Sequence, residues 1–218
     1  MSECSNQDTV IIDYGMGNLF SVTRVINHLG FQAKVSEDPK VIRRAKRLIL
    51  PGVGAFQDGM KNLKEKALVV PLKEVVASGT SLLGICLGMQ LLMTESEEFG
   101  LHQGLDLISG RVVRFVSPEA EQERFKIPHV GWSPLDNFSD GRWKNSILKD
   151  LMPGVFMYFV HSYVVVPDEE NTQLAQTHYG RNRFCSVIQK KNIVGCQFHP
   201  EVSGLSGLSV IKNFLSTS

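Results

Sequence analysis

A glycine-flanked cysteine at the end of an apolar run is the feature that most constrains how this chain can fold. Residues 82–85 predict a buried strand, and the apolar residues 87–93 that follow predict a helix. Cys86 stands between them, with Gly84 and Gly88 two residues to either side. Glycine at both places permits a sharp turn that strains the central residue. This is the pattern of a nucleophile elbow with sulfur in place of hydroxyl, and a helix N-terminus favours a thiolate.

The elbow alone also suits a buried structural cysteine, so a partner residue must be found. His199 follows the apolar run 193–198 and therefore also lies at the end of a predicted strand. Glu201 comes two residues later, and residues i and i+2 of an extended segment face the same way. A carboxylate beside an imidazole fixes its tautomer and stabilises its cation. Cys86, His199 and Glu201 thus predict a nucleophile–base–orienter triad; a polar turn before the last helix is the alternative for 199–201.

Strands and helices alternate in the first hundred residues. The pattern predicts strands at 9–14, 31–35, 48–50 and 82–85, and helices at 19–29 and 61–78. It also predicts a short helix from Asp38, and Pro71 marks a break or restart of the longest helix. This alternation predicts a parallel sheet with helices on both faces. Ligands of such sheets bind beyond the carboxyl ends of the strands.

The pattern changes after Phe99 to short strands separated by turn residues. They are predicted at 112–116, 132–135, 156–159, 163–166, 174–177, 185–189 and 193–198, with an exposed polar loop at 117–126 and a last helix at 205–215. These strands either join the same sheet as hairpins or form a second one. We therefore expect one α/β domain over 1–218, with an open, mostly parallel central sheet flanked by helices and antiparallel strands added in the C-terminal half.

Composition excludes several classes of function. A net charge of +1 gives no nucleic-acid surface, and no apolar run approaches the roughly 18 residues needed to cross a bilayer. The polar residues 1–8 lack the apolar core of a signal peptide. Four cysteines without CxxC spacing favour a reduced, cytoplasmic chain without a zinc site. A dinucleotide fingerprint at Gly15-x-Gly17 is incomplete, because Phe20 occupies the place of its third glycine.

Two segments taken together carry a resemblance. Residues 84–90 and 197–201 resemble the class I (triad) glutamine amidotransferase family, and residues 51–54 (Pro-Gly-Val-Gly) resemble its oxyanion strand. Within that family the match is closest to the glutaminase subunits of imidazole glycerol phosphate synthases, through residues 13–19, 128–132 and 158–163. These blocks agree in order from about residue 10 to 214, nearly the whole chain.

The resemblance implies hydrolysis of L-glutamine to glutamate and ammonia without a metal or other cofactor. Cys86 would attack the side-chain amide, His199 would protonate the departing ammonia and then activate water, and Glu201 would orient His199. The oxyanion would be held by backbone N–H groups of Leu87 and of the segment formed by Gly52 and Val53. By the same resemblance, the α-amino and α-carboxylate groups of glutamine would be bound by Gln90, Glu98, His161, Ser162 and Tyr163.

A glutaminase of this family passes its ammonia to a partner. Here the resemblance implies a (β/α)8-barrel cyclase that forms a heterodimer with this chain and serves histidine biosynthesis. Asn18 and Trp132 match positions that meet the cyclase, although Asn18 also suits a helix cap and Trp132 a core position. The resemblance further implies that the chain is nearly inactive without its partner.

Two departures from the family leave other readings open. Val202 stands where the family usually has lysine after His-Pro-Glu, and Ser133 stands where many members have asparagine. A related glutaminase that supplies ammonia for amidination of a bacterial surface sugar is therefore one alternative, and a catalytically silent regulatory subunit is another. A cysteine hydrolase of the α/β-hydrolase fold is disfavoured, because its carboxylate precedes the histidine in the chain whereas Glu201 follows His199.

Overall fold

The computed structural model describes residues 8–115, 126–139 and 141–216. The polar N-terminal segment 1–7, most of the loop expected at 117–126, and Val116 of the expected strand 112–116 lie outside the described residues. In the part of the chain that is described, no helix is long and apolar enough to cross a membrane.

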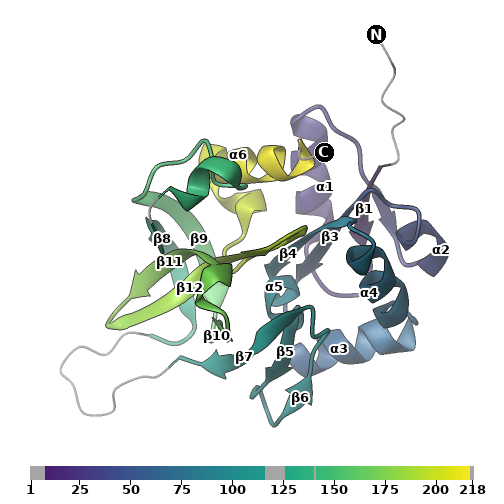
Figure 1. Cartoon of the computed structure of the whole chain (residues 1–218), viewed down its shortest axis with the longest axis horizontal. Helices are drawn as coiled ribbons and strands as arrows, with labels where there is room; N and C mark the ends of the chain where they lie inside the picture. Colours follow the sequence, from purple (N-terminus) through teal and green to yellow (C-terminus); the bar gives the residue numbers. More distant parts are fainter. Residues whose placement is uncertain (1–7, 116–125, 140, 217–218) are drawn as a thin grey trace.

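Nine strands form the main sheet, in the spatial order β2-β1-β3-β4-β13-β12-β11-β8-β9 (Figure 1). The first five are parallel, and β12, β11, β8 and β9 continue the sheet as antiparallel neighbours. Their bounds are β1 Thr9–Ile12, β2 Lys34–Ser36, β3 Arg47–Gly52, β4 Ser81–Cys86, β8 His129–Asn137, β9 Val155–His161, β11 Gln173–Tyr179, β12 Asn182–Lys190 and β13 Ile193–Cys196. The prediction of a mostly parallel central sheet extended by antiparallel strands is confirmed.

A smaller sheet of four strands, in the order β10-β7-β5-β6, lies beside the main one (Figure 1). Its strands are β5 Met93–Ser96, β6 His102–Gln103, β7 Ile108–Arg114 and β10 Tyr163–Pro167. The sequence prediction of a helix through residue 93 is wrong at its end, because α5 (Leu87–Leu91) stops and β5 begins at Met93. Residues 91–93 are buried throughout, so their apolar run carries no periodicity that could mark the change.

Helices cover both faces of the main sheet, because successive strand residues face opposite sides. In β1, Val10 and Ile12 pack in one apolar cluster with α3 (Phe56–Glu65), α4 (Val69–Ala77) and α5, whereas Ile11 packs in a second cluster with α1 (Leu19–His28) and α6 (Gly204–Leu215). The short helix α2 (Pro39–Ile42) begins at its Asp38 cap, as expected. The result is a three-layer α/β arrangement (Figure 1).

Several segment boundaries differ from the predictions. β7 begins at Ile108 rather than at residue 112, and β8 spans His129–Asn137 rather than 132–135. The expected helix 61–78 is two helices, α3 and α4, and α3 begins five residues earlier, at Phe56. The chain breaks at Ala67, which has a positive φ of 55°, rather than at Pro71, which lies in the first turn of α4 where a missing N–H is tolerated. The strand expected at 31–35 is shifted to Lys34–Ser36, since only this stretch pairs with β1.

The sheet order brings the candidate residues to one edge. In the register of β3 and β4, Gly52 lies opposite Cys86, and on the other side of β4 Cys196 lies opposite Ile85. The carboxyl ends of β3, β4 and β13 are therefore adjacent. The glycine-rich segment after β3, the cysteine after β4 and the histidine segment after β13 meet beyond them.

Candidate active site

The corner after β4 has the strained geometry expected of an elbow. Cys86 has φ 53° and ψ −109°, a region that a residue with a side chain rarely adopts. A Cβ on Gly88 would lie 1.8 Å from the carbonyl oxygen of Leu50, and one on Gly84 would lie 2.7 Å from that of Gly88. The two glycines are therefore required by close backbone packing on both sides of the cysteine. The helix that follows has only five residues, so its dipole is a minor aid to a thiolate.

His199 and Glu201 form a hydrogen-bonded pair in a 3-10 turn, η3 (Pro200–Val202). The His199 Nδ1–H donates to Glu201 Oε1 at 2.8 Å, and both side chains are buried. A carboxylate can only accept, so Nδ1 carries the proton and Nε2 is left for the hydrogen bond with Cys86. Burial lowers the pKa of His199, but the hydrogen bonds to Cys86 and Glu201 outweigh burial and raise that pKa to about 10. This arrangement suits a thiolate–imidazolium pair.

A pocket of about 230 Å³ opens onto Cys86 and His199. The predicted site residues that line it are Val53, Cys86, Leu87, Gln90, Glu98, His161, Ser162, Tyr163 and His199. Gly52 lies under the pocket opposite Cys86 in the sheet, and Glu201 lies behind His199. The structure thus brings together the residues that the sequence assigned to the triad, to the oxyanion strand and to glutamine binding.

Two of the predicted glutamine-binding side chains, Gln90 and Glu98, already have protein partners but keep one free oxygen each among the described residues. Gln90 Nε2 donates to the Tyr163 carbonyl oxygen at 3.0 Å and to Gln197 Oε1 at 3.2 Å, which leaves its Oε1. Glu98 Oε2 accepts the Phe56 N–H at 2.6 Å and so caps α3, which has no capping side chain of its own. The other oxygen of Glu98 has no hydrogen-bond partner among the described residues and can accept from a ligand in the pocket.

His161 has neither ring nitrogen free. Its Nδ1–H donates to the Tyr163 carbonyl oxygen at 2.9 Å, and its Nε2 accepts from His129 Nδ1–H at 3.2 Å. His129 Nε2 in turn accepts from the Ser133 hydroxyl at 2.9 Å. Each donor thereby meets an acceptor with both histidines neutral. Burial lowers the pKa of His129 to about 4 and that of His161 to about 3.

Sequence reasoning missed His129, Ser133 and Gln197. Gln197 Nε2 lies 3.7 Å from Cys86 Sγ, and it could have been found from the alternation that pairs His199 with Glu201, because Gln197 is two residues earlier on the same side. No comparable signal marks His129 and Ser133. The contact of His129 with His161 depends on the pairing of β8 with β9, where the two residues lie opposite each other, and Ser133 joins this network only through His129.

The two predicted interface residues are both exposed to solvent. Asn18 caps α1, with its side-chain oxygen accepting the Ser21 N–H at 3.1 Å. Trp132 on β8 is 52% exposed, so the alternative of a core tryptophan is wrong for it, whereas Trp143 is buried. In β8 and β9, alternate residues form an outward apolar face adjoining the pocket, composed of Val130, Trp132, Phe156, Tyr158 and Val160.

A comparison with family models matches residues 10–217 to the family described as glutamine amidotransferase class-I. The chain belongs to the class-I glutamine amidotransferase family. It is 49% identical over 207 residues to "Imidazole glycerol phosphate synthase subunit HisH" of Geobacter metallireducens, covering 94% of this chain and 95% of that protein. It is 46% identical over 206 residues to "Imidazole glycerol phosphate synthase subunit HisH 1" of Legionella pneumophila strain Paris, covering 94% and 97%.

Solved structures of amidotransferases show the same fold. A protein described as a glutamine amidotransferase superposes with a TM-score of 0.70 at 19% identity, over 94% of this chain and 96% of that one. The structure of PurLQS from Thermotoga maritima matches with a TM-score of 0.69 at 16% identity, over 96% and 97%. The class-I amidotransferase fold predicted from the sequence is thus confirmed.

Proposed function

We propose that this chain is the glutaminase subunit of an imidazole glycerol phosphate synthase, acting as one domain over 1–218. The observation that carries the proposal is the pocket over Cys86 and His199, in a chain that matches subunits of that name at nearly half identity over almost its full length. Cys86 and His199 of that pocket, with Glu201 behind His199, are the catalytic residues that convert L-glutamine to glutamate and ammonia.

The geometry supports a two-step acyl transfer. The Cys86 thiolate attacks the side-chain amide carbon of glutamine, and the electrons of the carbonyl move to oxygen as the C–S bond forms. His199, protonated and held by Glu201, then gives a proton to the departing ammonia and leaves a thioester. In the second step His199 takes a proton from water, the water attacks the thioester, and glutamate leaves as the thiolate returns.

Charge on the tetrahedral oxygen needs donors beside Cys86. The N–H of Leu87 begins α5 next to the nucleophile, and the Gly52–Val53 segment runs past it on the neighbouring strand end. We assign the oxyanion hole to these backbone groups. Removing one such donor typically costs ~3 kcal/mol of transition-state stabilisation.

Recognition of glutamine follows from the free acceptors of the pocket. We assign the α-ammonium group to Glu98, whose second oxygen has no partner among the described residues, and to Gln90 Oε1. Since both ring nitrogens of His161 are engaged, we assign the contact with the α-carboxylate to Ser162 and Tyr163. His161 then supports this loop rather than contacting the substrate.

The ammonia must reach a second active site. We propose a cyclase subunit of (β/α)8-barrel fold as the partner, docked on the outward apolar face of β8 and β9 with Asn18 and Trp132 in the contact. An exposed tryptophan beside a catalytic pocket is a suitable interface anchor. We further propose a cytoplasmic location, because a thiol nucleophile requires reducing conditions; Cys86, Cys185 and Cys196 are all free.

Two substitutions test this proposal in the complex with the cyclase subunit. Cys86→Ala and His199→Ala should abolish glutamine-dependent formation of product, because they remove the nucleophile and its acid. Both variants should keep the synthesis supported by added ammonium salts, since ammonia supply is bypassed. Loss of both activities would contradict a role limited to ammonia supply, and retained glutamine-dependent activity would contradict the triad.

A further inference from the structure

Gln197 is a buried amide in contact with the proposed nucleophile. It follows β13 directly, its backbone N–H donates to the Ser186 carbonyl oxygen at 2.9 Å, and its side chain is inaccessible to solvent. Its Nε2 lies 3.7 Å from Cys86 Sγ, within the range of an N–H···S hydrogen bond. Burying an amide is costly unless its polar atoms are paired, so the partners of Gln197 determine what it can do.

A single backbone carbonyl fixes which end of the amide faces the sulfur. The Tyr163 carbonyl oxygen can only accept, so the atom of Gln90 that lies 3.0 Å from it is the amide nitrogen. The second N–H of that nitrogen points to Gln197 at 3.2 Å, which makes the facing atom of Gln197 its oxygen. The nitrogen of Gln197 must then face Cys86. The same carbonyl accepts from His161, so it is held in place from two sides.

The sulfur of Cys86 also lies near a hydrogen-bond acceptor, whereas Gln197 offers it a donor. The Val160 carbonyl oxygen lies 3.6 Å from Cys86 Sγ, where it can accept from a thiol but offers a thiolate no donor. The short helix α5 offers only a weak dipole against this effect. His199 and Gln197 are the described side chains that present hydrogen-bond donors to the sulfur. Hydrogen bonds to a charged group are roughly twice as strong as neutral ones.

We propose that Gln197 is a further catalytic residue: its side-chain N–H donates to the Cys86 thiolate, and Gln90 with the Tyr163 carbonyl holds the amide in that direction. The inference rests on Cys86 being the nucleophile of the proposed function. Gln197 keeps its protons throughout the reaction. It stabilises the thiolate before attack and again when hydrolysis of the thioester returns the charge to sulfur.

The test is the alkylation rate of Cys86 by iodoacetamide in the full chain, followed by mass spectrometry of the peptide that contains Cys86. Gln197→Met removes the donor at similar volume. We expect the rate at pH 7 to fall about tenfold, because a hydrogen bond to the reactive thiolate is lost. At pH 10 the high pH itself favours the thiolate of Cys86 in wild type and variant alike, so the alkylation rate should change less than about twofold. Gln176→Met is the matched control, since Gln176 bonds to the Asn137 carbonyl oxygen on β8 and lies outside the pocket.

An unchanged rate at pH 7, or an equal fall at both pH values, would overturn the proposal in favour of a packing role. A measurement on the wild-type chain covers the case in which Gln197→Met does not fold. The side-chain amide signals of Gln197 in a nitrogen-15 NMR spectrum should move between pH 6 and pH 10 and should stay in place in Cys86→Ala; signals that behave alike in both proteins would also overturn it. The proposed function is tested separately: it would be contradicted if Cys86→Ala, in complex with the cyclase, still made product from glutamine.

Discussion

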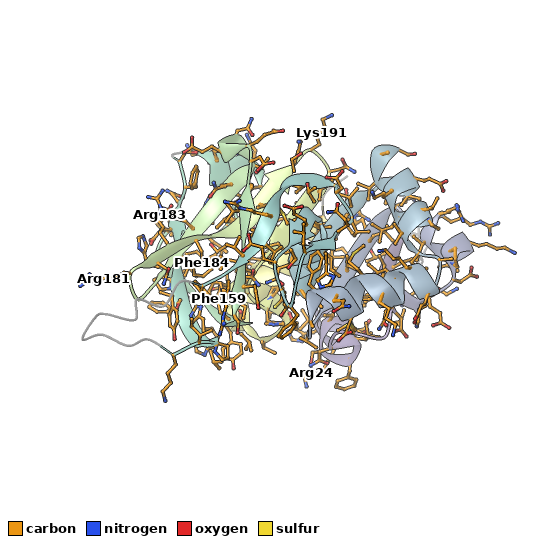
Figure 2. All side chains as sticks on the ribbon, turned by 90° about the horizontal axis from the view of Figure 1, so that it is seen from below. Arg24, Phe159, Arg181, Arg183, Phe184 and Lys191 are labelled. Atoms are coloured by element: carbon orange, nitrogen blue, oxygen red, sulfur yellow. The ribbon has the colours of Figure 1, made fainter. Side chains whose placement is uncertain are left out.

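Three buried histidines lie close together in this protein, and their partners give them opposite charge states. Burial lowers the pKa of His129, His161 and His199, but only His199 has a carboxylate and a sulfur as partners, and these raise its pKa to about 10. His129 and His161 bond to each other, to a hydroxyl and to a carbonyl, which keeps them neutral. The buried ring of Phe159 stacks on His129, and the buried ring of Phe184 meets His161 edge-on. Both rings are labelled in the β-rich half of the molecule in Figure 2.

The neutral pair makes stability depend on pH. In the unfolded chain a histidine takes up its proton near pH 6.5, whereas in the folded chain His129 does so only near pH 4 and His161 near pH 3. The unfolded state therefore binds more protons below pH 6.5, so these groups destabilise the fold as pH falls, by up to about 1.4 kcal/mol per pH unit for each histidine.

We expect the free energy of unfolding in urea to fall between pH 6.5 and pH 5, and to fall less steeply in His129→Asn. Comparing the two proteins cancels the contribution of the carboxylates that they share. An identical slope for wild type and variant would show that His129 is not held neutral in the folded state.

At the scale of single elements, the corner between β4 and α5 depends on two glycines. Gly88→Ala places a methyl group 1.8 Å from the Leu50 carbonyl oxygen, and this backbone atom of β3 cannot move aside as the end of a flexible side chain could. We expect a loss of roughly 3 kcal/mol or more in the free energy of unfolding, or no folded protein. Gly30→Ala is the control, because Gly30 has a positive φ of 80° and open space around it. It should cost only about 1 kcal/mol. Equal costs for the two changes would contradict the close packing at the elbow.

The start of α3 links a helix cap to substrate recognition through Glu98. In Glu98→Gln an amide oxygen can still accept the Phe56 N–H, so we expect the free energy of unfolding to stay within about 1 kcal/mol of wild type. The charge opposite the substrate ammonium is lost, so KM for glutamine should rise about tenfold or more with a smaller change in kcat. A loss of stability with KM unchanged would assign Glu98 to the cap alone.

The sequence predicts helices and strands well where a local signal marks their ends, and poorly where the pairing of distant strands sets their bounds and contacts. The parallel strands β1, β3 and β4, the α2 start and the elbow were predicted, because their apolar runs are bounded by turn and cap residues. The strand β5 was missed, since residues 91–93 are buried on all sides and show no period. The contact between His129 and His161 joins residues 32 positions apart in the chain and depends on the register of β8 against β9, which no local pattern contains.

At the scale of the whole molecule, the sheet order explains why the site exists at all. The segment after β13 is far from the elbow in the chain, yet β13 pairs with β4 and brings His199 beside Cys86. The antiparallel strands β8 and β9 lie side by side at the far end of the main sheet (Figure 1). They carry His161 and the outward apolar face that adjoins the pocket. Catalysis and docking of a partner are therefore expected to be coupled, since Val160 belongs both to the outward apolar face and to the lining of the pocket.

The most direct test of this account is the release of glutamate from glutamine by the purified chain, measured alone and then with its cyclase subunit and that subunit's ribotide ligand. We predict little release by the chain alone and strong stimulation in the complex, because we propose that docking of the partner orients the backbone donors of the Gly52–Val53 segment. High activity of the isolated chain would contradict this coupling. No stimulation by the cyclase, with the pocket intact, would contradict the assignment to imidazole glycerol phosphate synthase and favour a glutaminase for surface-sugar amidination.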